Sequence, residues 1–142
     1  MKNKTGKKVL YYVILAILLG VFCFSGYQIY SYYSEQNAST KLNEEIVREY
    51  TVRKTGEAKE YFEVDFDQLR QQNEDVTAWL YLPDSVINYP VLQHGDNDYY
   101  LTHDLKGNTN NNGSIFVEEV NSGSFSDGNT IIYGHNMKTG MM

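Results

Sequence analysis

Three histidines, His94, His103 and His135, are the side chains of this chain best suited to moving a proton near neutral pH. His94 and His103 lie in polar stretches with glycine and aspartate neighbours, which predicts that both are solvated. His135 differs because the apolar residues 131–133 and then Gly134 lead directly into it, as at the end of a buried strand. A strand end is a rigid mount, and proton transfer requires fixed geometry within hydrogen-bond reach. His135 is therefore the candidate general acid or base.

Two other kinds of chemistry could also use these histidines. A metal site would combine them with Asp96, Asp98 or Asp104, but no two histidines have a tight ligand spacing such as i, i+4. A Ser-His-Asp hydrolase would need an activated serine, and no serine lies in a G-x-S-x-G turn. We expect no metal and no other resident cofactor.

Cys23 is the only cysteine in the sequence. A single cysteine excludes an intramolecular disulfide framework and any zinc site built on several thiolates. Because Cys23 lies within the uncharged run 9–30, we expect it to behave as a small apolar residue in lipid rather than as a reactive thiol.

Residues 9–30 are 22 residues without a charge and are predicted to be a transmembrane anchor. About 20 apolar residues cross a hydrocarbon core as a helix, and tyrosines, which favour the headgroup level, lie at both ends of this run. The tail 1–8 is basic, so the positive-inside bias places it in the cytoplasm and the rest of the chain outside a single-pass membrane anchor. Cleaved signal and lipoprotein signal patterns fit poorly, because Phe22 precedes Cys23 and no small-residue cleavage site follows.

The charges of the chain are unevenly distributed around a formal net charge of −6. Residues 31–142 contain 8 Lys and Arg against all 18 Asp and Glu, a net charge of −10. Nucleic-acid binding needs clustered basic side chains against phosphate. The composition of this part therefore excludes a nucleic-acid partner.

Residues 31–64 are predicted to be a linker or stalk that contains a helix. Residues 34–40 are polar and without periodicity, which indicates a linker. Apolar residues then recur at four-residue spacing over 42–53, which predicts an amphipathic helix that either packs on the following domain or stands as a solvated stalk. A second helix is expected to begin at Asp65, where Gln68 completes a capping box, and to end near Asn73.

After this second helix the apolar pattern changes to short β-type runs. Residues 79–82, 86–92, 114–117 and 130–133 are four candidate strands, separated by stretches rich in Gly, Asn and Asp. Four short strands with long polar connections indicate a mainly β fold, either a barrel or a sandwich. The expected fold class is therefore mainly β, preceded by short helices and an N-terminal transmembrane helix.

Four sequence elements occur in order over 79–137: Trp-x-x-x-Pro, Asn-Tyr-Pro-Val, Gly-Ser-Ile-Phe and Tyr-Gly-His-Asn-Met. Through these elements jointly, residues 65–142 resemble the N-terminal half of the catalytic domain of a class B sortase. This resemblance implies a sortase-like β-barrel, incomplete here, and a cysteine transpeptidase of Gram-positive cell walls. Such an enzyme cuts the C-terminal sorting signal of a secreted protein, forms a thioester, and transfers the acyl part to an amine of the peptidoglycan precursor.

The resemblance also implies roles for individual residues. His135 matches the catalytic histidine, Tyr133 a position lining the substrate groove, and Asn97 and Leu101 positions that bind the sorting signal. The family's catalytic cysteine and arginine follow the histidine in segments that these residues do not contain, and Cys23 lies in the predicted anchor. We therefore expect the chain as written to be inactive and the isolated residues 34–142 to be poorly folded. The alternative is a membrane-tethered extracellular β module that binds a partner or cation through its acidic surface without catalysis.

Overall fold

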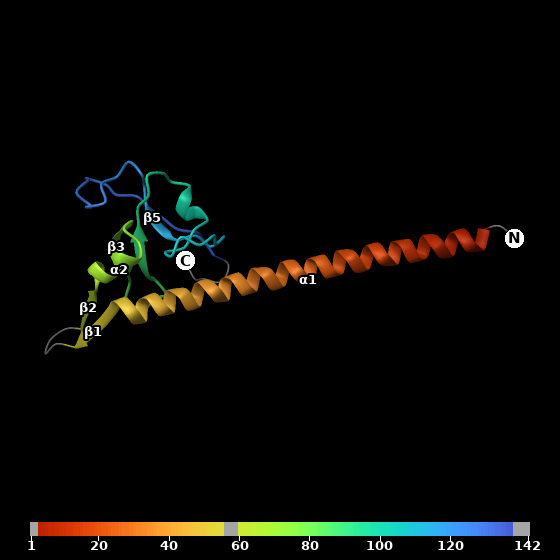
Figure 1. Ribbon diagram of the computed structural model, residues 1–142, viewed down its shortest axis with the longest axis horizontal. Coiled ribbons are helices and arrows are strands. Elements are labelled where there is room, and N and C mark those ends of the chain that lie inside the picture. Colours follow the sequence, from red (N-terminus) through yellow and green to blue (C-terminus); the bar gives the residue numbers. More distant parts are fainter. Residues whose placement is uncertain (1–2, 56–59, 138–142) are drawn as a thin grey trace. The chain divides into compact units, whose positions relative to one another are not determined.

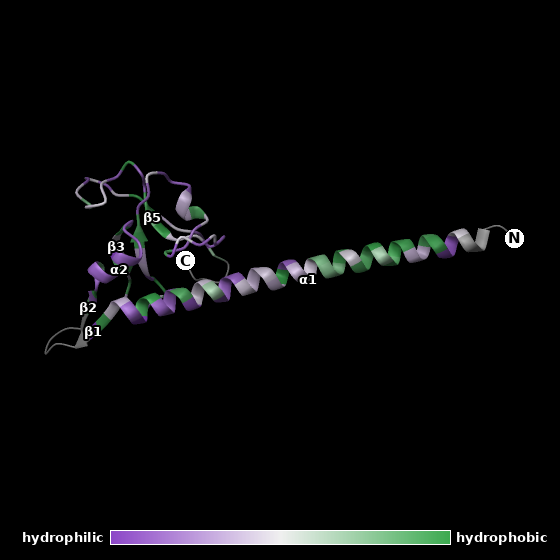
Figure 2. Cartoon of the chain, in the orientation of Figure 1, coloured by the Kyte–Doolittle hydropathy of each residue, from purple (hydrophilic) through white to green (hydrophobic). Residues whose placement is uncertain are grey.

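The computed structural model describes residues 3–55 and 60–137. The chain divides into two compact units, Met1–Ser34 and Glu35–Met142, and the helix α1, Asn3–Tyr50, contributes to both (Figure 1). The first unit is the N-terminal part of α1, where hydrophobic residues predominate (Figure 2). In length and composition this helix suits a membrane span.

The predicted linker at 34–40 is wrong, because α1 is helical throughout that segment. No glycine or proline lies between Tyr27 and Tyr50 to end the helix. The polar side chains are accommodated within it: the hydroxyls of Ser39 and Thr40 donate to the carbonyls of Glu35 and Gln36, at 3.1 and 3.0 Å.

A two-stranded hairpin and a short helix follow α1. The antiparallel strands β1, Thr51–Thr55, and β2, Glu60–Val64, were not predicted. The helix α2, Phe66–Gln72, begins where expected, since the Asp65 carboxylate accepts the backbone N–H of Gln68 at 2.9 Å, and its C-cap is Asn73.

The main sheet has four strands in the order β3-β4-β5-β6. They are β3, Val76–Tyr81; β4, Asn88–Leu92; β5, Ile115–Val117; and β6, Ile132–Tyr133. β3 and β4 are antiparallel, β4 and β5 parallel, and β5 and β6 antiparallel. The four predicted strand regions are confirmed, but they form an open mixed sheet, and the residues described here do not close a barrel (Figure 1).

The C-terminal part of α1 packs against the domain, which resolves the alternative left open by its amphipathic pattern. Ile46 and Tyr50 are 4% and 6% exposed and belong to the main core cluster. Burying an apolar side chain of this size contributes about 1.5–3 kcal/mol. The other buried members of the cluster are Leu69, Val76, Leu92, Tyr100, Leu105 and Phe116.

The connection between the parallel strands β4 and β5 wraps against α1. It contains the short 3-10 helix η1, Tyr99–Leu101, and an asparagine turn, residues 110–113. The Asn112 Oδ1 atom accepts a buried hydrogen bond from Gln36 at 2.6 Å, and its Nδ2 atom donates to the Ser39 hydroxyl at 2.6 Å. The turn that precedes β5 is therefore held by the helix segment that the sequence suggested was a linker.

Candidate functional site

His135 lies just after β6, at the edge of the main sheet. β6 pairs with β5 through Tyr133 opposite Phe116 and Ile132 opposite Val117. The expected position at a strand end is correct, but the strand is not buried: Ile132 and Tyr133 are both 38% exposed. The histidine itself is partly buried. An accessible edge with a partly covered imidazole suits exchange of protons with a bound molecule.

The His135 ring makes a specific contact with the connection between β4 and β5. Its Nε2 atom lies 2.8 Å from the carbonyl oxygen of Leu101 in η1. A carbonyl only accepts, so Nε2 carries the proton and the Nδ1 atom of the neutral ring carries the lone pair. Two residues predicted for the site, His135 and Leu101, are thus brought together.

Two glycines allow the chain segments around this contact to approach closely. A Cβ atom on Gly134 would lie 2.5 Å from the Ile115 Cδ1 atom. The missing side chain at Gly134 therefore makes room for the Ile115 side chain of β5. Gly113 has φ +61°, and a Cβ atom there would lie 2.4 Å from the backbone carbonyl oxygen of Tyr100 and 2.8 Å from that of Leu101. The asparagine turn therefore packs closely against the backbone of η1, whose Leu101 carbonyl accepts the hydrogen bond from His135.

Asn97 and Tyr133 meet through a residue that the sequence analysis missed. The Asn97 side-chain amide and the Tyr133 hydroxyl each donate a hydrogen bond to the carboxylate of Glu118, directly after β5. These bonds, with Tyr133 as the larger cause, lower the pKa of Glu118 below its usual value, and the same contact raises the pKa of Tyr133. Only the run of two acids after the strand at 114–117 could have pointed to Glu118.

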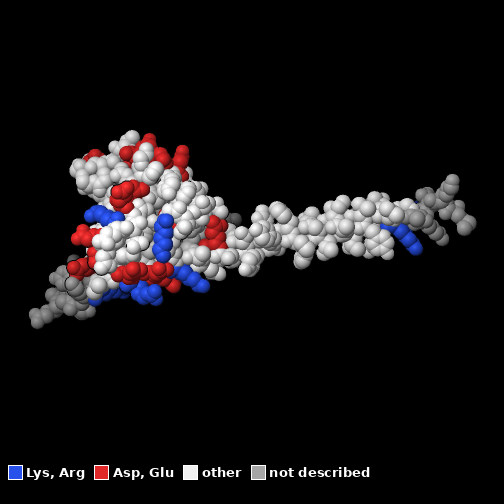
Figure 3. Space-filling model, in the orientation of Figure 1, with Lys and Arg blue, Asp and Glu red and all other residues white. Residues whose placement is uncertain are grey.

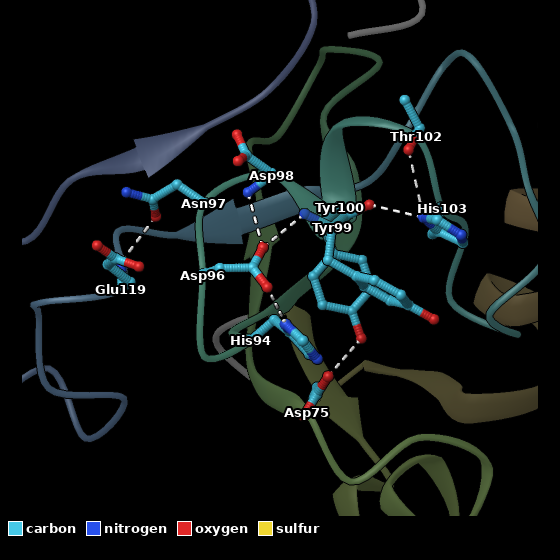
Figure 4. A network of polar contacts seen from close by, with 10 residues as sticks. All are labelled: Asp75, His94, Asp96, Asn97, Asp98, Tyr99, Tyr100, Thr102, His103 and Glu119. Carbon is cyan, nitrogen blue, oxygen red and sulfur yellow. Dashed lines mark hydrogen bonds and ion pairs between the residues drawn. The ribbon is translucent and has the colours of Figure 1, made fainter.

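His94 and His103 are both partly exposed, but each also stacks on a face of Tyr99, which the sequence did not predict. The ring centroids lie 4.5 Å apart for His94 and 4.1 Å apart for His103. The His94 Nδ1 atom lies 2.9 Å from Asp96, whose pKa is lowered by backbone N–H groups of Tyr99 and then Asp98. Figure 4 shows this cluster beside the Asn97–Glu119 contact. Within the described residues, no group of three or more His, Cys, Asp or Glu is placed to hold a metal ion.

Comparisons with known proteins agree on one family. No family model matches the chain. It is 39% identical to sortase B of Listeria monocytogenes over 131 residues, which is 89% of this chain and 52% of that protein. It is 29% identical to sortase B of Staphylococcus aureus over 125 residues, 88% of this chain and 50% of that protein. The chain thus spans about half the length of the curated relatives it matches.

Solved structures of sortases share this fold. Sortase B from Bacillus anthracis superposes with a TM-score of 0.62 at 32% identity, covering 76% of this chain and 51% of that one. A Streptococcus pyogenes class B sortase involved in pilus biogenesis gives 0.53 at 35% identity, over 56% and 43% of the two chains. A Staphylococcus aureus sortase B–substrate complex gives 0.52 at 36% identity, over 54% and 36%. With the ordered motifs and the placement of His135, these likenesses show that the chain belongs to the class B sortase family.

Proposed function

We propose that this chain supplies the histidine and one wall of the substrate groove of a class B sortase transpeptidase. The observation that carries the proposal is the meeting of three segments at the sheet edge. His135 bonds to Leu101, and Tyr133, two residues earlier, is joined through Glu118 to Asn97. The solved Staphylococcus aureus relative was obtained as a substrate complex, which supports a peptide-binding groove in the family.

The proposed reaction has two acyl-transfer steps. A cysteine thiolate attacks the carbonyl carbon of the sorting signal; the C–N bond breaks, and the amine leaves with a proton from the His135 imidazolium. The incoming amine of the peptidoglycan precursor then attacks the thioester and gives a proton to the imidazole as the C–S bond breaks. The thiol must come from outside these 142 residues, because their only cysteine, Cys23, lies in the apolar part of α1.

The chain is proposed to work at the outer face of the cell membrane. Residues 9–30 would anchor it, the basic residues 1–8 would remain in the cytoplasm, and the acidic domain would face secreted proteins that carry a C-terminal sorting signal. The finding that supports this topology is the charge asymmetry around the apolar part of α1.

A chimera tests the role of His135. Residues 35–142 replace the matched residues of Listeria monocytogenes sortase B, which supplies the remainder of the domain. We expect the chimera to cleave the peptide substrate of the Staphylococcus aureus enzyme, and H135A to lower kcat by about 10²–10⁴-fold. The control is H103A, a histidine outside the proposed machinery, with activity close to that of the parent chimera.

Two results would contradict the proposal. One is a folded parent chimera with no thioester product by mass spectrometry, and the other is an H135A rate equal to that of H103A. Either result, together with peptide or cation binding by residues 1–142, would favour the non-catalytic tethered module. The coding sequence after codon 142 provides an independent check, because the transpeptidase requires an extracytoplasmic cysteine.

A further inference from the structure

Glu118 is held by the backbone on both sides of the sheet end. Its N–H donates to the Ile131 carbonyl at 3.0 Å, and its carbonyl accepts from the Gln93 side-chain amide at 3.1 Å. Gln93 also donates to the Asn121 carbonyl at 2.7 Å. These hydrogen bonds join the segments after β4, after β5 and before β6. The backbone of Glu118 is therefore held in place, which limits where its side chain can lie.

The Glu118 carboxylate uses its two oxygens on two different segments. Oε1 accepts from the Nδ2 atom of Asn97, just ahead of η1, and Oε2 accepts from the Tyr133 hydroxyl on β6. The Asn97 amide cannot turn over freely, because its Oδ1 atom accepts the backbone N–H of Glu119 at 2.8 Å, a contact drawn in Figure 4. One side chain therefore fixes the orientation of both neighbours.

These bonds decide what Asn97 and Tyr133 can offer to a bound molecule. The Tyr133 proton is directed to Glu118, so its oxygen is left as an acceptor, while the second Nδ2 hydrogen of Asn97 remains a donor. An acceptor and a donor fixed on neighbouring segments match the N–H and C=O of a peptide backbone.

We propose that Glu118 is a positioning residue that orients Tyr133 and Asn97 to receive a backbone amide of the sorting signal. This inference rests on the proposed function, because it assigns the ligand of the same groove. It adds a residue that touches no substrate itself. Removing its carboxylate should free the Tyr133 hydroxyl and the Asn97 amide to rotate, so that peptide binding weakens although both groups remain.

The test measures peptide binding by the full chain in detergent micelles. The probe is the fluorescently labelled peptide substrate of the Staphylococcus aureus enzyme, followed by anisotropy. We expect E118A to raise Kd by about tenfold or more, as the loss of an oriented, charge-assisted contact implies. E118Q should recover only part of the affinity. Its amide oxygen can still accept from Asn97, but its NH₂ group donates to the Tyr133 oxygen and no longer takes the Tyr133 proton.

E119A is the matched control, since it removes the same charge from the adjacent position and keeps the backbone N–H that Asn97 uses. We expect its Kd to remain within about twofold of that of the parent chain. In an N97A/Y133F background, the further effect of E118A should be small, because the residues through which Glu118 acts are gone.

The outcomes separate the two proposals. Parent binding with equal Kd values for E118A and E119A would overturn the role of Glu118 and leave the groove intact. Absence of parent binding would overturn the peptide groove and the inference with it. If E118A does not fold, E118Q and Y133F test the role of Glu118 instead. A Kd for Y133F equal to that of the parent chain would show that the Tyr133 oxygen accepts no hydrogen bond from the peptide.

Discussion

Tyr100 shows how single side chains hold the connection that carries the site. It is 1% exposed, its hydroxyl donates to the Asp75 carboxylate at 2.7 Å, and it accepts from the Asn73 amide at 2.9 Å. The same amide donates to the Leu105 carbonyl at 2.8 Å. Burial and then the hydrogen bond to Asp75 raise the pKa of Tyr100 well above its usual value. The end of α2 and the start of β3 are thereby bonded to η1.

Y100F tests this network by removing only the hydroxyl. We expect the free energy of unfolding in urea to fall by about 1–3 kcal/mol, because the partly buried Asp75 carboxylate loses a donor. Y81F is the control, since Tyr81 uses its ring, stacked on Phe62 at 4.5 Å, rather than a buried hydroxyl. Equal stability of Y100F and the parent chain would contradict the account.

The same variant has a pH signature. Because the folded-state pKa of Tyr100 lies above the unfolded value of 10.0, its contribution to stability is fully present below pH 10. That contribution is lost as the pH rises from there through the folded pKa, since the unfolded state then releases its proton first. The stability difference between the parent chain and Y100F should therefore narrow above pH 10.

The sequence predicted correctly the helices and strands that are stabilised by residues close together in the chain. α2 has its cap and the four strand regions have their apolar runs, whereas the helix across 34–40 is held by side chains of the distant turn 110–113. The β1–β2 hairpin was missed because nothing in its polar, alternating residues marked it off from a stalk. At the site, the family motif indicated His135 and Tyr133, but Glu118 and Gly113 matter through contacts between segments far apart in the sequence.

G113A tests the contact between the asparagine turn and η1. A methyl group would overlap two backbone carbonyls at a positive φ, so we expect a loss of at least about 2 kcal/mol in unfolding free energy. The Leu101 carbonyl should also shift, which NMR of the His135 imidazole would detect. G95A is the control, because a Cβ atom there meets nothing within 4 Å. A chain as stable with G113A as with G95A would rule out this close packing.

The whole molecule combines an uncharged helical segment with an acidic domain. Figure 3 shows basic atoms toward the N-terminal end of α1 and many acidic atoms on the domain surface. The side chains of residues 9–30 are exposed in the structure, which is costly in water and favourable in lipid. This combination supports the proposal that the chain is tethered to a membrane by α1 with its acidic domain outside.

Cysteine labelling tests the proposed topology. In a C23S background, a membrane-impermeant maleimide added to intact cells should label K41C and not K7C, two lysines whose side chains are exposed. K7C should react once the cells are permeabilised, which shows that the thiol is competent. Labelling of K7C in intact cells, with K41C protected, would reverse the orientation.

The parallel pairing of β4 and β5 also sets an order of events during folding. β3 and β4 are joined by the short connection 82–87 and can form a local hairpin early. β5 can join only after residues 93–114 have crossed over, because parallel strands cannot be linked by a tight turn. His135 follows β6, which is positioned by its pairing with β5. Its hydrogen-bond acceptor, the Leu101 carbonyl, lies in the crossover. This imidazole contact therefore requires the crossover and β5 to be in place, whereas the β3–β4 hairpin does not.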